Sequence, residues 1–140
     1  MVELAKIDDL KKLDDIELLT ALVLGEAESE SLIGKIAVAC VVRNRVRNKR
    51  WPDAWKEVML QSKQFSCFLP EFFRSEILEK DRLNPVWREC NFAAFGVYNK
   101  YIRAEAHGAN HYHANYIDPP YWTKGHKPVL IIGKHVFYKL

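Results

Sequence analysis

The sequence predicts one mainly helical α+β domain spanning residues 1–140. Two observations predict this class. Three long stretches carry apolar residues at helical spacing, whereas the last third is rich in aromatic and β-branched residues. A length of 140 residues and a hydrophobic content of 49% are sufficient for one packed core. The sequence contains no internal repeat, low-complexity segment or linker that would indicate a second domain.

The first two long helices lie in the first third of the chain. The first should follow residues 13–15, whose two aspartates suit a helical N-terminal turn, and end near Leu24 or Gly25. Its apolar face is formed by Ile16, Leu19 and Val23. The second helix should end before Trp51-Pro52. Its apolar stripe is formed by Ile33, Ile36, Ala37, Cys40 and Val41.

The third long helix should begin at Asn84-Pro85, because an asparagine cap followed by proline is a strong start signal. A shorter helix is expected between Asp53 and Leu60, and the segment between these two helices is expected to be irregular. The buried face of the third helix is expected to comprise Val86, Cys90, Ala93, Ala94, Val97 and Tyr101.

A β-hairpin is predicted at the C-terminus. Gly133-Lys134 has the character of a tight turn between residues 129–132 and 135–138. Tyr112 and His113 are expected on a further short strand, where alternation directs their side chains to opposite faces.

Cysteine content and charge limit the setting. The three cysteines are scattered and odd in number, so we expect buried thiols and folding in a reducing cytosol: Cys40, Cys67 and Cys90. The formal net charge of +3 suits an anionic polymer such as a cell wall or nucleic acid. The sequence shows no long apolar run and starts with alternating charges. We therefore expect no stable membrane insertion and no secretion signal of its own.

Three glutamates gather between the first two helices. Glu26 falls where the first helix ends, and there the negative end of the helix dipole and partial burial both disfavour an ionised carboxylate. Glu26 is therefore the candidate general acid. Glu28 and Glu30 precede the second helix, whose N-terminus they can stabilise. The alternative for all three is a solvated loop acid.

Several ordered blocks, from about Leu18 to Tyr138, resemble one known family. The blocks are LVLGEAESESLIGKIAVACVVRNRV, WPDAWKEVMLQSKQFS, ANHYH, PPYW and IGKHVFY. They are similar to the SleB/CwlJ family of cell wall hydrolases, which includes spore-cortex-lytic enzymes and phage lysins. The resemblance implies a lysozyme-like, lytic-transglycosylase-like helical domain with a small C-terminal β-hairpin or sheet. No cofactor or metal is expected.

The resemblance places the catalytic glutamate of the family on Glu26 and its second motif acid on Glu30. It implies cleavage of the β-1,4 bond between N-acetylmuramic acid and N-acetylglucosamine in peptidoglycan, by lytic transglycosylation. One acid can protonate the leaving oxygen and then accept the proton of the muramic acid C6 hydroxyl as a 1,6-anhydro ring closes. The chain departs from the family motif at Glu28, Ser29 and Arg43, which bears on substrate specificity. The matching helix pattern consists of Gly34, Ala37, Val38, Asn44, Arg45 and Val46.

The same resemblance supplies substrate-binding candidates. The Gln-Phe-Ser block offers an aromatic ring between hydrogen-bonding groups, although its phenylalanine could simply be buried. Tyr112 is expected near the reacting sugar, and Trp122 either stacks on a sugar or closes the small hydrophobic core. Glu30 is given a supporting role, and His135 and Phe137 are expected to be structural. The predicted substrate-binding residues are Glu30, Gln64, Phe65, Ser66, Tyr112, His113 and Trp122.

Three alternative functions remain open. A hydrolytic muramidase requires Glu30 close enough to Glu26 to act as a second carboxylate. A zinc-dependent peptidoglycan amidase would bind its metal through His111 and His113 with a third histidine, which is His107, His126 or His135. The basic run at 43–50 could bind nucleic acid, but its cations also suit a helix C-terminus and no nucleic-acid motif accompanies them, so no nucleic acid partner is expected.

The expected partner is the glycan strand of peptidoglycan, and the expected oligomeric state is a monomer. The substrate lies outside the membrane, whereas the sequence shows no export signal, so we expect synthesis in the cytoplasm and action on the cell wall. A phage endolysin with holin-dependent access to the wall fits both requirements.

Overall fold

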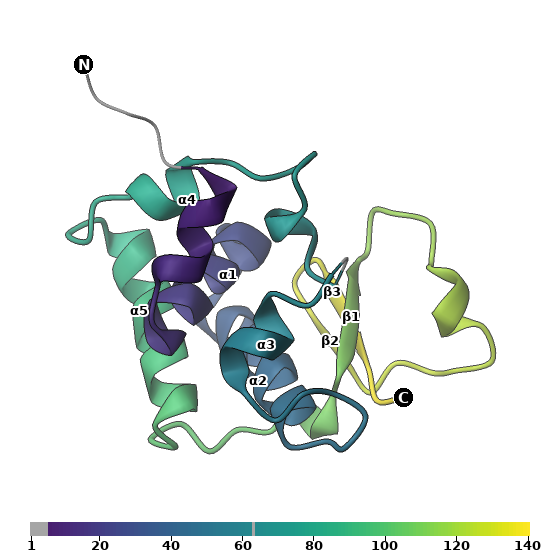
Figure 1. Ribbon diagram of the computed structural model, residues 1–140. Helices are drawn as coiled ribbons and strands as arrows, with labels where there is room; N and C mark the ends of the chain where they lie inside the picture. Colours follow the sequence, from purple (N-terminus) through teal and green to yellow (C-terminus); the bar gives the residue numbers. More distant parts are fainter. Residues whose placement is uncertain (1–5, 63) are drawn as a thin grey trace.

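The computed structural model describes residues 6–62 and 64–140, so the charged start considered above lies partly outside the described residues. Helices α1 (Asp15–Ala27), α2 (Leu32–Val46) and α5 (Pro85–Tyr98) form a helical lobe on one side of the molecule. A small sheet lies beside this lobe, and the segment between β1 and β2 extends beyond the sheet (Figure 1). The predicted mainly helical α+β class is confirmed.

The long helices begin at the residues that the sequence indicates. The side chains of Asp14, Ser31 and Asn84 each accept a hydrogen bond from a backbone N–H in the first turn of the helix that follows. The first helix continues past Gly25, so Glu26 lies inside its last turn.

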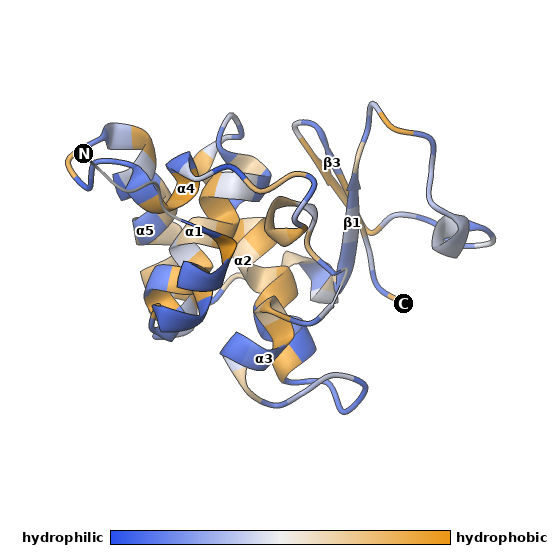
Figure 2. Cartoon of the chain, turned by 45° about the horizontal axis from the view of Figure 1, so that its top comes forward, coloured by the Kyte–Doolittle hydropathy of each residue, from blue (hydrophilic) through white to orange (hydrophobic). Residues whose placement is uncertain are grey.

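One hydrophobic core joins the helical lobe to the sheet. Leu22, Val41 and Val97 of the three long helices are fully buried, as is Phe137 of the last strand. Apolar residues line the facing sides of the helices (Figure 2).

Two residues of the predicted apolar faces are exposed. Ile33 is 67% exposed, because it lies in the first turn of α2 on the side away from the core. Tyr101 is 76% exposed, because α5 ends at Tyr98 and Lys100 takes a left-handed conformation that turns the chain away. The prediction was wrong at both positions.

Short elements connect the long ones. Helix α3 (Trp55–Met59) lies within the short helix that was predicted. The middle of the chain, expected to be irregular, contains one 3₁₀ turn and one helical turn, η2 (Ser66–Phe68) and α4 (Glu76–Glu79). The remaining 3₁₀ turns are η1 (Ile7–Lys12), η3 (Ala106–Gly108) and η4 (Tyr121–Thr123).

The sheet has three antiparallel strands in the order β1-β3-β2. The predicted hairpin is confirmed as β2 (Leu130–Ile132) and β3 (His135–Tyr138), joined through the turn at Gly133. Strand β1 (His111–Ala114) pairs with the other side of β3 and forms an edge of the sheet.

The last turn of α2 holds the segment that leads into β1. Arg43 donates to the carbonyl of Ala104 at 2.7 Å, Asn44 donates to that of Ala109 at 2.8 Å, and Arg45 donates to that of Asn110 at 2.7 Å. Both arginines are only 4% exposed. The interpretation of the basic run as an exposed cationic end is therefore wrong at Arg43 and Arg45, which bind backbone carbonyls instead.

The prediction for the cysteines is confirmed. Cys40, Cys67 and Cys90 are buried free thiols, as predicted. Within residues 6–62 and 64–140, no helix has the length and apolar character needed to cross a bilayer.

Candidate active site

A groove with a volume of about 990 Å³ separates the helical lobe from the outer segment of the sheet region. Among the described residues that line it, Glu26 is the one carboxylate, accompanied by three arginines and several aromatic rings. Such a mixture of rings and a few polar groups is typical of a ligand site. The lining residues are Gly25, Glu26, Arg45, Arg50, Gln64, Phe65, Ser66, Cys67, Phe72, Arg74, His111, Tyr112, His113, Ala114, Tyr116, Ile117, Pro120, Tyr121, Trp122, His135 and Leu140.

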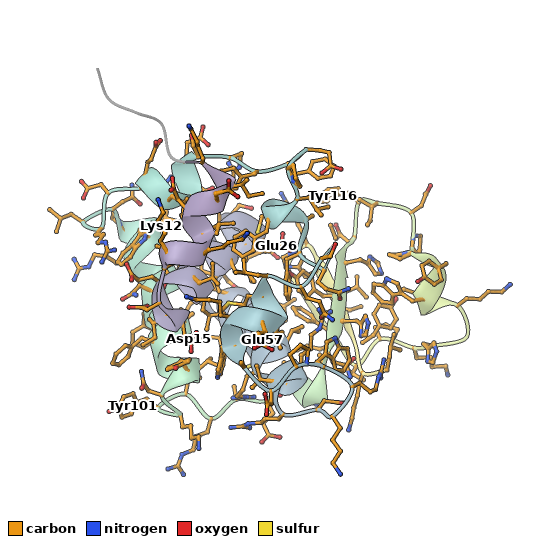
Figure 3. The ribbon with its side chains drawn as sticks, viewed as in Figure 1. Lys12, Asp15, Glu26, Glu57, Tyr101 and Tyr116 are labelled. Atoms are coloured by element: carbon orange, nitrogen blue, oxygen red, sulfur yellow. The ribbon has the colours of Figure 1, made fainter. Side chains whose placement is uncertain are left out.

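Glu26 lies on the side of the helical lobe that faces the groove (Figure 3). The Tyr112 hydroxyl donates a hydrogen bond to Oε1 of Glu26 at 2.7 Å. The Ser66 hydroxyl donates to Oε2 at 3.0 Å. Two hydroxyls from different elements therefore fix the orientation of the carboxyl group.

Tyr112 keeps its proton and acts as a hydrogen-bond donor in this arrangement. Burial, followed by the negative charge of Glu26, holds the pKa of the Tyr112 hydroxyl well above its usual range. Its ring packs against His135 and Phe137, with centroid distances of 5.0 and 5.7 Å. The phenol thus stays protonated and is held rigidly against Glu26.

A close approach between α1 and η2 brings Ser66 to the same carboxylate. A Cβ atom at Gly25 would lie 2.7 Å from the Cβ of Cys67, so a larger residue would push η2 away. The Cys67 thiol lies in this contact, where burial, followed by the charge of Glu26, raises its pKa well above the usual range. Gly25 is therefore part of how the groove is assembled.

The Gln-Phe-Ser block reaches the groove at each of its three positions. Phe65 is 2% exposed, and its ring centroid lies 5.1 Å from the guanidinium carbon of Arg45. The same guanidinium donates to Oε1 of Gln64 at 3.1 Å. Phe65 is thus a buried ring beside polar residues, and Gln64 and Ser66 present the hydrogen-bonding groups.

His113 and Tyr112 point to opposite faces of the sheet, as predicted. His113 is 8% exposed, and its Nε2 lies 3.3 Å from the Tyr138 hydroxyl. Trp122 packs on this face, with ring centroids 5.0 Å from His111 and 5.4 Å from Tyr138. Trp122 therefore closes the packing on the outer face of the sheet and also lines the groove.

Glu30 lies outside the described lining of the groove. It is 9% exposed, and its Oε1 accepts the backbone N–H of Lys134 at 2.8 Å. Its carboxylate therefore supports the β2–β3 turn. Glu28 does not cap α2, because it pairs with Lys80 at 3.1 Å and Arg74 at 3.3 Å, and these cations lower its pKa.

Sequence reasoning missed several groove residues. His111 lines the groove, although the sequence suggested it only as a metal ligand. Burial, followed by the charges of Arg45 and Arg50, lowers the pKa of His111 to about 4. Arg45 could have been found, since it belongs to the helix pattern shared with the family. The exposed rings of Tyr116 and Tyr121 had no signal beyond their nearness to Trp122 in the sequence.

The histidines do not form a metal cluster. Among residues 6–62 and 64–140, no group of three His, Cys, Asp or Glu side chains is arranged to hold a metal ion. His111 and His113 share one face of the sheet with Trp122, whereas His135 packs against Tyr112 on the other. The ligand set of the zinc amidase alternative is therefore not brought together.

Comparison with known proteins bears on the family and the fold. The model of a family described as cell wall hydrolase matches residues 29–138, a range that begins just after Glu26. The catalytic domain of the Bacillus cereus SleB protein is similar, with 23% identity, a TM-score of 0.67 and coverage of 89% of both chains.

A second solved structure is the catalytic domain of the germination-specific lytic transglycosylase SleB from Bacillus anthracis. It also has 23% identity, with a TM-score of 0.70, and the match covers 89% of this chain and 93% of that one. No curated protein sequence matches. At this identity the structural matches establish the fold, and they confirm the one that the sequence resemblance implied.

Proposed function

Because the chain belongs to the cell wall hydrolase family, and is thus an enzyme that degrades peptidoglycan, we propose that it acts as a lytic transglycosylase. The bond cleaved is the β-1,4 linkage between N-acetylmuramic acid and N-acetylglucosamine. Glu26 is the proposed acid and base. A solved structure of the same fold carries the name of a lytic transglycosylase.

The main support for this proposal is that the described lining of the groove contains one acidic side chain, Glu26. Hydrolytic glycosidases commonly use two carboxyl groups about 5–9.5 Å apart, one as acid and the other as base or nucleophile. Among the described lining residues only Glu26 is acidic. Glu30, the second acid of the family motif, accepts the Lys134 N–H instead. This arrangement favours a reaction that needs one carboxyl group.

One carboxyl group can complete the reaction in two steps. Glu26 first gives its proton to the glycosidic oxygen, and the bond from that oxygen to C1 of the muramic sugar breaks. The resulting carboxylate then takes the proton of the C6 hydroxyl, while O6 bonds to C1 and closes the 1,6-anhydro ring. The acid is regenerated and no water is consumed.

The hydrogen bonds of Glu26 support an assignment of roles to its two oxygens. Tyr112 remains a donor, so Oε1 is kept as an acceptor. The Ser66 hydroxyl can rotate to donate or to accept, so Oε2 can exist with or without a proton. We assign the transferred proton to Oε2.

Digestion of peptidoglycan in ¹⁸O-labelled water tests the proposal. We expect anhydromuramyl products without ¹⁸O, detected by mass spectrometry. Reducing ends that carry ¹⁸O would indicate a hydrolytic muramidase, and released peptides would indicate an amidase. Each of these two results would contradict the transglycosylase assignment.

The route to the wall is a separate proposal. We propose that the protein is a phage endolysin made in the cytoplasm, with a holin giving access to peptidoglycan. The net charge of +3 suits binding to an anionic wall. Lysis of a host that expresses the protein should then require co-expression of a holin.

A further inference from the structure

Arg45 is a buried cation in the wall of the groove. Its side chain is 4% exposed, and it contributes to the groove lining near Tyr112 and Gln64. Its guanidinium lies between two rings, 5.4 Å from the centroid of Trp51 and 5.1 Å from that of Phe65. This position fixes the group and limits its access to water.

The charge of Arg45 has no carboxylate partner within residues 6–62 and 64–140. Its Nε donates to the carbonyl of Asn110 and its Nη1 donates to Oε1 of Gln64, and both acceptors are neutral. Two other cations on this helix are buried. Lys35 pairs with an acid, Glu89, whereas Arg43 donates to the carbonyl of Ala104 and does not line the groove. A buried cation without a counter-charge is costly unless a ligand supplies one.

The surroundings of Arg45 add to the positive charge. Arg50 also lines the groove and lies 4.5 Å over the Trp51 ring, with its Nη1 bound to the carbonyl of Leu140. Burial of His111 and, as the next causes, the charges of Arg45 and Arg50 lower the pKa of His111 to about 4. The third arginine of the groove, Arg74, is paired with Glu28. Within residues 6–62 and 64–140, Arg45 and Arg50 have no acidic side chain as partner, so unpaired positive charge gathers at the Arg45 end of the groove.

We propose that the Arg45 end of the groove binds a carboxylate carried by the muramic sugar of the substrate. This inference rests on the proposed function. The glycan backbone is neutral except at the 3-O-lactyl group, which ends in a free carboxylate or in a stem peptide that carries carboxylates. The Gln-Phe-Ser block links Arg45 to the reacting centre, because Gln64 accepts a hydrogen bond from Arg45 and Ser66 donates one to Glu26. The carboxylate bound is thus on a sugar at or beside the bond that breaks.

Two forms of glycan strand, each with free and with amidated carboxylates, test the proposal with the unmodified enzyme. One form carries stem peptides, a second has lost them and ends in lactyl carboxylates, and each is also prepared with its carboxylates converted to amides. We expect amidation to lower kcat/KM for anhydromuramyl product by about tenfold, the size of one charged hydrogen-bonded contact. If only the peptide-bearing form responds, the carboxylate belongs to the stem peptide. If the peptide-free form responds, the lactyl group is the source.

Two matched variants assign the effect to Arg45. In Arg45→Gln the ratio of rates on carboxylated and amidated strands should fall close to one. Arg43→Gln should keep the ratio of the unmodified enzyme, because Arg43 is equally buried on the same helix and does not line the groove. Arg45→Lys, which keeps the charge, should retain part of the ratio if Arg45→Gln does not fold.

The proposal is overturned if amidation leaves the rate of the unmodified enzyme unchanged, a result that needs no variant. It is also overturned if Arg45→Gln keeps the full ratio or if Arg43→Gln loses it. Absence of anhydromuramyl product from every substrate would instead contradict the proposed function, so the two failures are distinguishable.

Discussion

Glu26 and Tyr112 form the central contact of the groove, and the two residues come from opposite ends of the chain. One ends α1 and the other lies on the edge strand β1, and the contact between them is 2.7 Å. A phenol whose pKa is raised well above its usual value of 10 remains a hydrogen-bond donor at neutral pH. Tyr112 therefore positions the carboxyl group without competing for its proton.

Replacing Tyr112 with phenylalanine should lower kcat by about tenfold or more while the fold is kept, because one hydrogen bond to the reacting carboxyl group is lost. Product formation on peptidoglycan measures the effect. Tyr98→Phe is the matched control, since it removes a 2.9 Å hydrogen bond to Asp15 away from the groove. That variant should lose about 1 kcal/mol of unfolding free energy and keep its kcat. Equal kcat in Tyr112→Phe and the unmodified enzyme would refute the positioning role.

Motif resemblance identified residues around the candidate acid of the groove, but it could not describe their contacts. Seven of the eight predicted site residues line the groove, and Glu30 does not. A motif records which residues recur together, whereas burial decides whether an acid faces a substrate or a backbone N–H. The same limit explains Arg45, whose side chain turns inward to the carbonyl of Asn110 although it lies in a run of surface cations.

At the scale of elements, the β2–β3 turn depends on Glu30. Gly133 adopts a left-handed conformation with φ of 53°, and the carboxylate of Glu30 lies directly against it. The Lys134 N–H binds that carboxylate. This buried acid joins the loop between α1 and α2 to a hairpin more than a hundred residues later.

Gly133→Ala should destabilise the protein by more than Gly125→Ala. Both glycines have positive φ, so alanine at each carries a conformational cost of roughly 1–2 kcal/mol. A Cβ at Gly133 would also lie 2.5 Å from Oε1 of Glu30, whereas nothing lies within 4 Å of one at Gly125. Urea unfolding of the two variants isolates the difference, which is the contact with Glu30. Equal losses would contradict the role given to this contact.

Local signals were sufficient for elements that begin at a cap or turn. The asparagine and proline before α5 and the glycine of the hairpin act within a few residues of the chain. No such signal announced η2, because its position depends on the contact of Cys67 with Gly25, more than forty residues away. The end of α5 before Tyr101 likewise follows from the turn at Lys100.

At the scale of the whole molecule, two histidines couple stability to pH. Burial lowers the pKa of His111 to about 4 from an ordinary value of 6.5, and burial also lowers the pKa of His135. The unfolded chain therefore binds more protons than the folded protein between these values, so the folded state loses stability as the pH falls from 6.5 towards 4.

His111→Gln should reduce this loss. The variant cannot take up a proton at position 111 in the unfolded state, so its free energy of unfolding should decline less between pH 6.5 and pH 4, leaving the share due to His135. Urea midpoints of the two proteins across this range give the comparison. Parallel declines would show that His111 does not contribute.

The arrangement of the helical lobe and the sheet could be predicted as a class, and its groove could not. Apolar spacing indicates which helix faces are buried, and the resemblance supplied the fold that the solved structures share. Strand β1 lies opposite Glu26 because Asn44 and Arg45 hold the carbonyls of residues 109 and 110, directly before the strand, against α2. These are contacts between distant segments, which spacing along the chain does not encode.

The most direct test of the account compares Glu26→Gln with Glu30→Gln by mass spectrometry of digested peptidoglycan, with circular dichroism to verify that both fold. We predict that Glu26→Gln lowers anhydromuramyl product by about 10²- to 10⁴-fold, the usual contribution of a general acid. Glu30→Gln should retain most of the activity, because its amide oxygen can still accept the Lys134 N–H. Full activity in a folded Glu26→Gln protein, or equal losses in the two variants, would contradict the single-acid account.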